Sequence, residues 1–531
     1  MDLKEFIHDL HFDVDKVSPP NREVDWEDAP LPYKVYRRRP VTPLPADIPL
    51  SLNGRKTPFY PTLAEIGHLL WYAFGLNSVC QNVIGGEITG FRTSTMQSLR
   101  RFVPSGGALY PSELYVYLKP EDAKSGVYHY DTAHHGLTLL REGNYDSYLH
   151  RSLGGRCDVA GCFGIAFVST VFWRNYFKYD RFAYRLQGLD AGALMGQLLE
   201  VSKRFHVNTD VYFQFLDDAV NHLLGLATEQ ESVYAAIALS NDSGTRRPDG
   251  PDRNPEFLSA VLCGEVPPLK AQEYVRSKRI SVDPLLREMN IRSKIDSSRR
   301  FMSAPFPPRS HSVLHAHRED PDVMLPRVKL PQKDFAEVCR GRYSPGQDFV
   351  QYPIEVEQVG SLLHEAWQSF MYASDRTGID SRSCEDVQLY GCLFGVDGIA
   401  DGAYRYNPQR HALHLICAGD YRRRLQTGMV MDNVNLLTVP LCLHVAGARD
   451  HLMSVLGYRG YRIQQMEVGM LVQRILLAAS ALEMNGHPLL GFDCDLVDSI
   501  YDLPSANETA LIQIPVGRYR PRPQLEGPLR G

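Results

Sequence analysis

The stretch from Arg101 to Tyr117 reads RFVPSGGALYPSELYVY. Its basic first residue leads into a tight turn, Pro104-Ser105-Gly106-Gly107, and an alternating strand follows from Glu113 to Leu118. Two glycines without a Cβ can adopt φ > 0 and let a flat ligand lie close to the backbone. The exposed N–H groups of the turn and the Ser105 hydroxyl can donate to a polar ring edge. Because glycine-rich turns are weak signals alone, an ordinary loop before a strand is the alternative interpretation.

The composition is that of an ordinary globular protein. The chain has 531 residues, of which 44% are hydrophobic and 22% charged, enough for about two to four domains. The formal net charge of −5 gives no electrostatic footprint for nucleic acid. The N-terminus, MDLKEFIHDLHFDVD, lacks the regions of a signal peptide, and no apolar run reaches the roughly 18 residues that span a bilayer. We therefore expect a cytoplasmic protein that binds neither membrane nor nucleic acid.

The cysteines and histidines do not indicate a metal site. The ten cysteines are scattered without a CxxC pair, which is typical of buried thiols in a reducing compartment. His311, His315 and His317 have a loose metal-like spacing, but their cluster has no carboxylate or cysteine partner. We expect no metal.

A pattern in the first half of the chain returns in the second half. The segment GVYHYD at Gly126 is echoed by GAYRYN at Gly402. Tyr184-Arg-Leu-Gln187 is echoed by Tyr461-Arg-Ile-Gln464 with a spacing one residue longer. That longer spacing also relates further pairs: Gly192 and Gly469, Phe215 and Phe492, Asp218 and Asp495, and Glu231 and Glu508. Chance does not readily give one register over so many positions, so we interpret the chain as an internal duplication of one α+β unit.

The boundaries follow from this repeat and from composition. Residues 1–60 are rich in proline and charge, and we expect an extended arm on the body of the protein or a partly disordered segment. Residues 241–255, NDSGTRRPDGPDRNP, are linker by composition. The predicted parts are an arm (1–60), a first domain (61–240), a linker or insertion (241–335), a second, degenerate domain (336–520) and a tail (521–531).

The two copies keep different polar residues. The second copy has SCEDVQLYG where the first has PSGGALYPSELY, so the turn is lost. The second copy in turn has RGRYS ending at Ser344, LGF around Gly491, and GRYR near its end. In the FKYDRFAYR segment, three polar residues face different ones in the second copy: Lys178 faces Val455, Tyr179 faces Leu456 and Arg181 faces Tyr458. Complementary loss favours one site built from both copies, whereas ordinary drift would leave the second copy purely structural.

Together, RFVPSGGALYPSELYVY, GVYHYD, FKYDRFAYR, QGLDAGALMGQLL and the FLDDAVNHLLGL and VYAAIAL segments resemble the FMN-dependent nitroreductase superfamily. Within it they are similar to the SagB/McbC-type azoline dehydrogenases of thiazole/oxazole-modified peptide biosynthesis. The resemblance covers residues 60–240 well and residues 335–520 more weakly. It implies an α+β fold of two nitroreductase-like domains, each a central antiparallel or mixed sheet flanked by helices, in a tandem chain that folds as its own pseudo-dimer.

The resemblance also implies FMN as the cofactor. The residues of the turn would touch the flavin ring: Pro104, Ser105, Gly106 and Gly107. Residues of the second copy would take the phosphate: Arg342 and Ser344, with Arg518 or Arg520. Gly491 would lie against the ring edge, and Arg101 is a further candidate. A guanidinium binds phosphate in a bidentate fork, which lysine cannot do. Arg55-Lys-Thr57 in the first copy is also a usable phosphate clip, so either half could hold the phosphate.

The expected reaction is azoline oxidation, in which a hydride goes to FMN, a proton goes to a base, and O2 reoxidises the flavin. Lys178 and Tyr179 match the Lys-Tyr pair of the family and are the candidate catalytic residues. Desolvation beside a flavin lowers the pKa of a lysine and makes the neutral amine available as a base. The alternative interpretation is that Lys178 is a solvated lysine on a mobile segment. The implied partners are a modified precursor peptide or small azoline as substrate and a cyclodehydratase complex.

Two other functions also fit the sequence. The fold permits an NAD(P)H-dependent nitro or flavin reductase, which needs no glycine-rich dinucleotide fingerprint. A non-catalytic, flavin-stabilised scaffold of a peptide-modifying complex is the third hypothesis, and the retained Lys178-Tyr179 pair argues against it. One shared site predicts one flavin per chain, whereas two independent sites predict two. A monomeric pseudo-dimer and a higher homo-oligomer both agree with the sequence.

Overall fold

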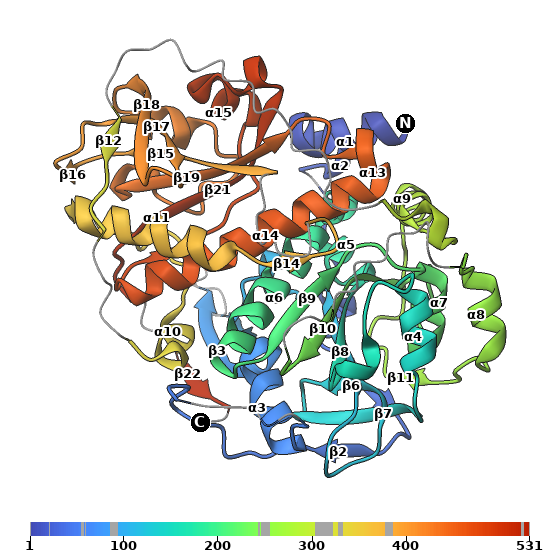
Figure 1. Cartoon of the computed structure of the whole chain (residues 1–531). Helices are drawn as coiled ribbons and strands as arrows, with labels where there is room; N and C mark the ends of the chain where they lie inside the picture. Colours follow the sequence, from blue (N-terminus) through green and yellow to red (C-terminus); the bar gives the residue numbers. More distant parts are fainter. Residues whose placement is uncertain are drawn as a thin grey trace. The chain divides into compact units, whose positions relative to one another are not determined.

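The structure of the protein is a computed structural model (Figure 1). It describes residues 2–20, 22–54, 58, 60–84, 94–242, 245, 255–302, 322–327, 333–377, 386–521 and 525–529. The chain forms two compact units, and neither is one continuous stretch. Unit 1 contains Met1–Pro20, Pro305–Tyr372 and Arg382–Pro521, and unit 2 contains Asn21–Ala304, Ala373–Ser381 and Arg522–Gly531.

Unit 2 is built on an eight-stranded sheet with the order β14-β9-β10-β8-β5-β6-β7-β2. Neighbouring strands are antiparallel, except that β14 runs parallel to β9. The strands are β2 (Val41–Pro43), β5 (Ser112–Leu118), β6 (Gly126–Asp131), β7 (Gly136–Glu142), β8 (Gly164–Val171), β9 (Asn208–Tyr212), β10 (Glu231–Ser240) and β14 (Ala373–Ser374).

Helices cover both faces of this sheet. Successive residues of a strand point to opposite faces, so neighbouring residues of β5 pack against different helices. Tyr115 and Tyr117 of β5 join a core with α4 (Asp146–Ser152), α7 (Asp217–Leu224) and α8 (Ser259–Glu265). On the other face, Val116 and Leu118 lie against α3 (Leu63–Phe74), which packs on α6 (Ala183–Arg204). The short helix α5 (Trp173–Tyr179) follows β8 and leads into α6.

Unit 1 repeats this architecture. Its seven-stranded sheet has the order β20-β21-β19-β15-β17-β18-β12, which matches β9-β10-β8-β5-β6-β7-β2 strand for strand. Its strands are β12 (Val323–Met324), β15 (Val387–Leu393), β17 (Gly402–Asn407), β18 (Ala412–Ala418), β19 (Leu441–Ala448), β20 (Asn485–Gly486) and β21 (Glu508–Gly517). Four helices correspond to α3, α6, α4 and α7: α11 (Val356–Phe370), α14 (Tyr458–Ala481), α12 (Arg422–Thr427) and α15 (Cys494–Tyr501). The predicted α+β fold and its duplication are confirmed.

Single hydrogen bonds recur in the two units as well. Tyr130 Oη lies 2.8 Å from His135 Nδ1, and Tyr406 Oη lies 3.0 Å from His411 Nδ1. Both histidines have a left-handed backbone, with φ of 50° and 51°. A buried tyrosine–glutamate hydrogen bond of 3.1 Å also recurs: Tyr115 to Glu231 and Tyr390 to Glu508. Contacts that both copies keep are those that the fold itself needs.

The first residues of the chain differ from the predicted extended or disordered arm. They form α1 (Leu3–Phe12) and α2 (Val14–Val17) and belong to unit 1. Asp2 caps α1 by accepting from two backbone N–H groups, and Phe6, Ile7 and Leu10 are buried. The expectation is wrong for this segment because its few apolar residues have helical spacing, which its overall charge obscured.

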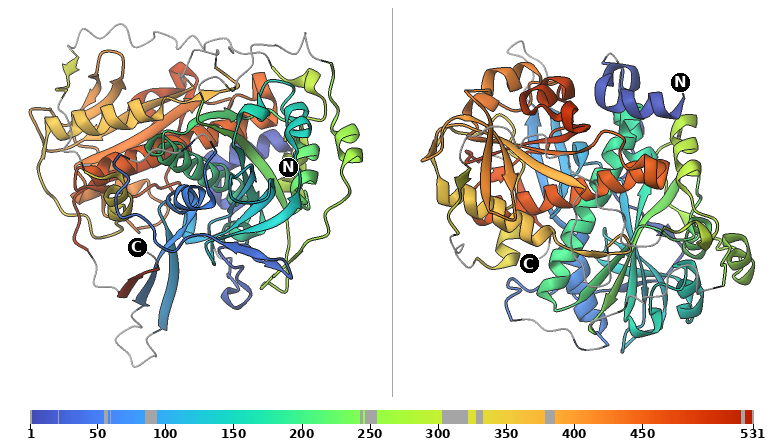
Figure 2. Two further views of the ribbon diagram at one scale, coloured as in Figure 1. Left: turned by 60° about the horizontal axis from the view of Figure 1, so that its bottom comes forward. Right: turned by 45° about the horizontal axis from the view of Figure 1, so that its top comes forward.

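Two short segments from beyond the first copy complete unit 2. Ala373–Ser374 is the edge strand β14, and the next residue, Asp375, accepts from the N–H groups of Phe213 at 3.1 Å and Gln214 at 2.9 Å. Near the C-terminus, β22 (Leu525–Pro528) pairs with β3 (Leu76–Ile84), which pairs with β4 (Ser94–Arg101). Figure 2 shows the dark red strand β22 beside these blue strands. Strands this short have no periodicity that would reveal their partner.

Candidate active site

The Ser105–Gly107 turn has a defined geometry in unit 2. Ser105 is extended, Gly106–Ala108 form one 3-10 turn, and Gly107 has φ of +63°. Backbone bonds close the turn from Ala108 N to Ser105 O at 3.0 Å and from Leu109 N to Gly106 O at 3.4 Å. Among the described residues, none accepts from the Gly107 N–H, and Gly107 is exposed. The turn therefore has an exposed backbone donor, and its contact with a flavin ring stays a prediction.

The structure brings Lys178 and Tyr179 to this turn. A Cβ built on Gly107 would lie 2.7 Å from Tyr179 Oη and 2.9 Å from Lys178 Nζ. Both residues end α5, and the next residue, Asp180, has the strained backbone angles φ 52° and ψ −140°. Strain of this kind costs about 1–3 kcal/mol and is retained where the surroundings hold it in place. The predicted proximity of the turn and the Lys-Tyr pair is thus present within one unit.

The environment of the pair changes its acid–base properties. Burial lowers the pKa of Lys178, whose ammonium lies 4.9 Å from the ring centroid of Tyr179 and 5.7 Å from that of Trp26. Burial, followed by the charge of Asp190, raises the pKa of Tyr179. At neutral pH the site therefore combines a phenol that stays protonated with an amine that gives up its proton more easily than usual. Trp26 was not predicted from the sequence.

A buried acid that the sequence did not reveal lies beneath the turn. Asp190 of α6 accepts from Ser105 Oγ at 2.7 Å and from Gly106 N at 3.3 Å. Ser105 Oγ in turn accepts from Tyr110 N at 2.9 Å. The sequence placed Asp190 in a helix with small residues, and nothing in that pattern relates it to a turn so distant along the chain.

Arg174 joins α5 by a hydrogen bond and an ion pair to the segment that follows the turn. Its Nη1 donates to Tyr110 O at 2.9 Å, and its Nη2 forms an ion pair with Glu113. Glu113 also contacts His129 Nε2 at 2.7 Å. Burial would raise the pKa of Glu113, but Arg174 and His129 outweigh burial, and the pKa is lowered. Arg174 and Lys178 are one helical turn apart, so the same face of α5 meets both Tyr110 and Gly107.

Arg101 lies in the interior of unit 2. Its side chain is fully buried, and it donates to Phe74 O at 3.2 Å and Pro32 O at 2.6 Å. The guanidinium also lies over the rings of Phe74 and Tyr110, at 3.9 Å and 4.9 Å from their centroids. These contacts assign Arg101 to the packing of unit 2.

In unit 1, the residues predicted to bind phosphate lie on two neighbouring segments. Arg342 Nη1 lies 3.5 Å from Ser344 Oγ. Between them, Tyr343 stacks on Tyr519 with ring centroids 5.3 Å apart. The two segments are further joined by backbone bonds from Val350 N to Arg518 O and from Arg520 N to Asp348 O, at 3.0 Å and 2.9 Å. The structure thus brings Arg342 and Ser344 near the segment of Arg518 and Arg520.

Gly491 lies beside the loop that contains Val430. Its carbonyl accepts from Val430 N at 3.0 Å, and a Cβ built on Gly491 would meet Val430 at an ordinary distance of 3.5 Å. Neither its φ nor its neighbours in unit 1 require glycine. Its role beside a flavin remains a hypothesis.

Two groups predicted from the sequence lie outside the described residues. These are Arg55-Lys-Thr57, the alternative phosphate clip, and the histidines His311, His315 and His317.

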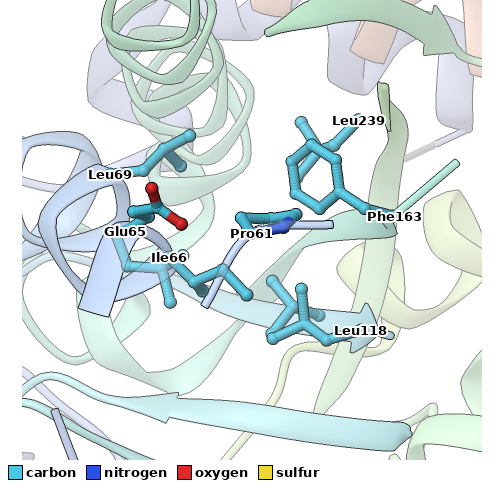
Figure 3. Close-up of a pocket in the computed structure, with 9 residues that line it drawn as sticks. Pro61, Glu65, Ile66, Leu69, Leu118, Phe163 and Leu239 are labelled. Atoms are coloured by element: carbon cyan, nitrogen blue, oxygen red, sulfur yellow. The ribbon is translucent and has the colours of Figure 1, made fainter. Parts of the chain in front are cut away.

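An apolar pocket in unit 2 is separate from the Lys178 site. It is lined by residues of α3, by Val116 and Leu118 of β5, and by Phe163 and Leu239 (Figure 3). Glu65 lies at this pocket, but its carboxylate accepts from Thr62 N at 2.8 Å as part of the cap of α3. The pocket lies toward the end of β5 opposite to the Ser105–Gly107 turn. Convergent polar groups, which characterise binding sites, are absent from its lining.

In the part of the chain that the structure describes, no helix has the length and apolar character needed to cross a membrane.

The chain resembles known proteins in fold and in sequence. A solved structure from Anabaena variabilis, described as a nitroreductase, matches 98% of this chain and 99% of its own with a TM-score of 0.72 at 19% identity. The protein MJ1384 of Methanocaldococcus jannaschii, named as a nitroreductase, is 24% identical over 197 residues, which are 37% of this chain and 92% of that protein. No family model matches the chain.

Two processing proteins are also similar. The trifolitoxin-processing protein TfxB of Rhizobium leguminosarum bv. trifolii is 31% identical over 226 residues, 39% of this chain. The microcin B17-processing protein McbC of Escherichia coli is 30% identical over 157 residues, 28% of this chain. The chain spans 58% of TfxB and 57% of McbC.

The fold of the chain is nitroreductase-like. In sequence, the chain is similar to the processing proteins TfxB and McbC, the kind of protein that its motifs indicated.

Proposed function

We propose that this chain is an FMN-dependent dehydrogenase that oxidises thiazoline or oxazoline rings of a modified peptide to thiazoles or oxazoles. The closeness of Lys178 and Tyr179 to Gly107 carries the proposal, because it puts an amine and a phenol beside an exposed glycine of the turn. The similarity to two peptide-processing proteins supports a peptide substrate.

The residues present fit a flavin. Gly106 and Gly107 have no Cβ, and none of the described residues accepts from the Gly107 N–H, which leaves this donor for a ligand. In unit 1, Arg342, Ser344 and Arg518 offer the guanidinium and hydroxyl donors that a phosphate requires. When bound, FMN supplies the hydride acceptor.

The chain itself supplies the acid–base chemistry. Oxidation of an azoline removes one hydrogen as a hydride and one as a proton from adjacent ring atoms. Lys178 Nζ takes the proton, since its lowered pKa makes the neutral amine available. Tyr179, whose pKa is raised, stays protonated and donates a hydrogen bond within the site. Proton transfer of this kind contributes roughly 10²–10⁴ to the rate.

We further propose that the chain works beside a cyclodehydratase. An azoline forms when a cysteine, serine or threonine side chain closes on the backbone with loss of water. A cyclodehydratase must therefore supply the substrate, either as a free enzyme or in a complex with this chain.

Anaerobic mixing of the flavin-loaded chain with a thiazoline-containing peptide tests the proposal. We expect bleaching of the flavin absorbance, formation of the thiazole with a loss of two mass units, and recovery of the absorbance on exposure to O2. Bleaching by NADPH and not by the peptide would instead support a nitro or flavin reductase, the function that the name of the M. jannaschii protein favours.

A further inference from the structure

Asp190 accepts hydrogen bonds from two polar groups of the turn. Ser105 Oγ donates to Asp190 Oδ2 at 2.7 Å, and Gly106 N donates to Oδ1 at 3.3 Å. Because Ser105 Oγ also accepts from Tyr110 N at 2.9 Å, its hydrogen and one of its lone pairs are both used inside the protein. Ser105 therefore does not donate to a ligand while Asp190 is ionised, unlike what the sequence suggested.

The hydrogen-bond pattern depends on the charge of Asp190. An ionised carboxylate only accepts, so the Ser105 hydrogen must point toward it. A protonated carboxyl donates instead, and Ser105 Oγ then accepts from both Asp190 and Tyr110 N. The Ser105 hydrogen is then released to point away from Asp190. The same three heavy atoms thus have two arrangements of hydrogens.

The surroundings of Asp190 hold few other charges. From α5, the charge of Asp190 acts on Tyr179, and Lys178 Nζ lies 2.9 Å from the position that a Cβ on Gly107 would occupy. The turn itself has no titratable side chain between Ser105 and Leu109. Helix α3 meets α6 two turns further on, where Gln197 donates to Tyr72 O. Burial, opposed by the bonds from Ser105 and Gly106, raises the pKa of Asp190 to about 7.

The equivalent position of unit 1 has a different partner. Glu467 of α14 accepts from the hydroxyl of Tyr372 at 2.8 Å, and the second copy lacks the Ser-Gly-Gly turn. A buried acid recurs at this place in the fold, but its connection to the turn is specific to the first copy.

We propose that Asp190 is a positioning residue whose charge sets the direction of the Ser105 hydroxyl and hence the donors that the turn presents to a flavin ring. The inference deepens the proposed function, because it takes the flavin as the ligand of the turn. The two charge states of Asp190 differ by one donor at the turn, the Ser105 hydroxyl. The Gly107 N–H remains a donor in both states.

Flavin binding as a function of pH tests this inference without turnover. The dissociation constant of FMN would be measured by fluorescence quenching from pH 5.5 to 8.5 for the full chain, Asp190→Asn and Tyr179→Phe. We expect the wild-type affinity for FMN to fall about fivefold as the pH rises through 7, because Ser105 then loses one hydrogen bond to the ligand. Tyr179→Phe should keep this midpoint, and Asp190→Asn, which cannot ionise, should lose it. A flat wild-type profile, or a midpoint that persists in Asp190→Asn, would overturn the inference.

A second measurement needs no flavin and so separates this inference from the proposed function. Because the folded pKa of Asp190 is raised, its contribution to stability is present below the unfolded pKa of Asp and is lost as the pH rises to about 7. The melting temperature of the wild type relative to Asp190→Asn should therefore fall across this range and then level off. Ser105→Ala should move the midpoint to higher pH, because it removes a bond that favours the ionised form. An unmoved midpoint would contradict the coupling of Ser105 to Asp190.

Discussion

Lys178 Nζ stands 2.9 Å from the position that a Cβ of residue 107 would occupy, and glycine at 107 leaves that position to the amine. Gly107 also has φ of +63°, which side chains rarely adopt. Two independent constraints, sterics and backbone conformation, therefore require glycine beside the residue that we propose as the base.

Gly107→Ala should damage the site more than the fold. The left-handed φ costs about 1 kcal/mol for alanine, and the new methyl group must displace Lys178 and Tyr179. We expect a loss of turnover of at least tenfold with a small fall in melting temperature. Gly395→Ala is the matched control, since Gly395 has φ of +61° and a Cβ there meets nothing within 4 Å, and it should lower the melting temperature slightly but leave turnover unchanged. Equal turnover in the two variants would contradict the proximity of the pair to the reaction.

Lys178→Ala should retain the flavin but lower turnover by roughly 10²–10⁴, the usual contribution of a general base. Because burial lowers the pKa of Lys178, wild-type turnover should rise with pH and level off below the pH expected for an ordinary lysine. Lys124→Ala, at an exposed lysine paired with Glu142, serves as the control and should behave like the wild type. Loss of FMN with unchanged turnover per bound flavin would refute the role of Lys178.

Features that depend on residues close together in the chain could be predicted from the sequence, whereas contacts between distant residues could not. Local alternation predicted the strand from Glu113 to Leu118, and the repeated register predicted the duplication that the strand orders confirm. The resemblance implied that Lys178 and the Ser105–Gly107 turn serve the same flavin, whereas their spacing along the chain indicated no proximity. Asp190 escaped prediction because its partner, Ser105, is distant and because one aspartate in a helix looks like any solvated residue.

The short strands of unit 2 escaped prediction for a different reason. The edge strand Ala373–Ser374 and the C-terminal strand Leu525–Pro528 have too few residues for periodicity to identify their sheet. The helix Leu3–Phe12 escaped prediction because the charged composition of its segment obscures the helical spacing of its apolar residues.

The buried ion pair between Arg174 and Glu113 should be needed for stability and for the position of α5. Glu113→Gln leaves a buried guanidinium without its counter-charge, which costs about 3–5 kcal/mol. Urea unfolding would measure the loss. Glu265→Gln, which removes the partly exposed pair with Arg151, should cost about 0–1 kcal/mol.

The pH dependence of this loss has a definite sign. Since the folded pKa of Glu113 is lowered, its charge stabilises the protein above the unfolded pKa, and this contribution disappears as the pH falls. The difference between wild type and Glu113→Gln should therefore shrink below about pH 4. A difference that is constant from pH 7 to pH 3 would show that the charge of Glu113 is not what stabilises unit 2.

Arg342→Ala and Arg518→Ala should weaken FMN binding without altering the binding of riboflavin, which has no phosphate. The affinity for FMN should fall at least tenfold, because a charge-assisted hydrogen bond contributes about 1.5–3 kcal/mol. Arg299→Ala, at an exposed arginine, is the control. Equal losses for FMN and riboflavin would place these arginines elsewhere than at the phosphate.

The central proposal is that this chain is a flavoprotein that binds a single FMN beside the Ser105–Gly107 turn and the Lys178-Tyr179 pair. The most direct measurement is the visible absorbance spectrum of the purified chain, with the FMN released on denaturation counted per chain. The account predicts a yellow protein with one FMN per chain. A colourless protein that does not take up added FMN, or a stoichiometry of two, would contradict it.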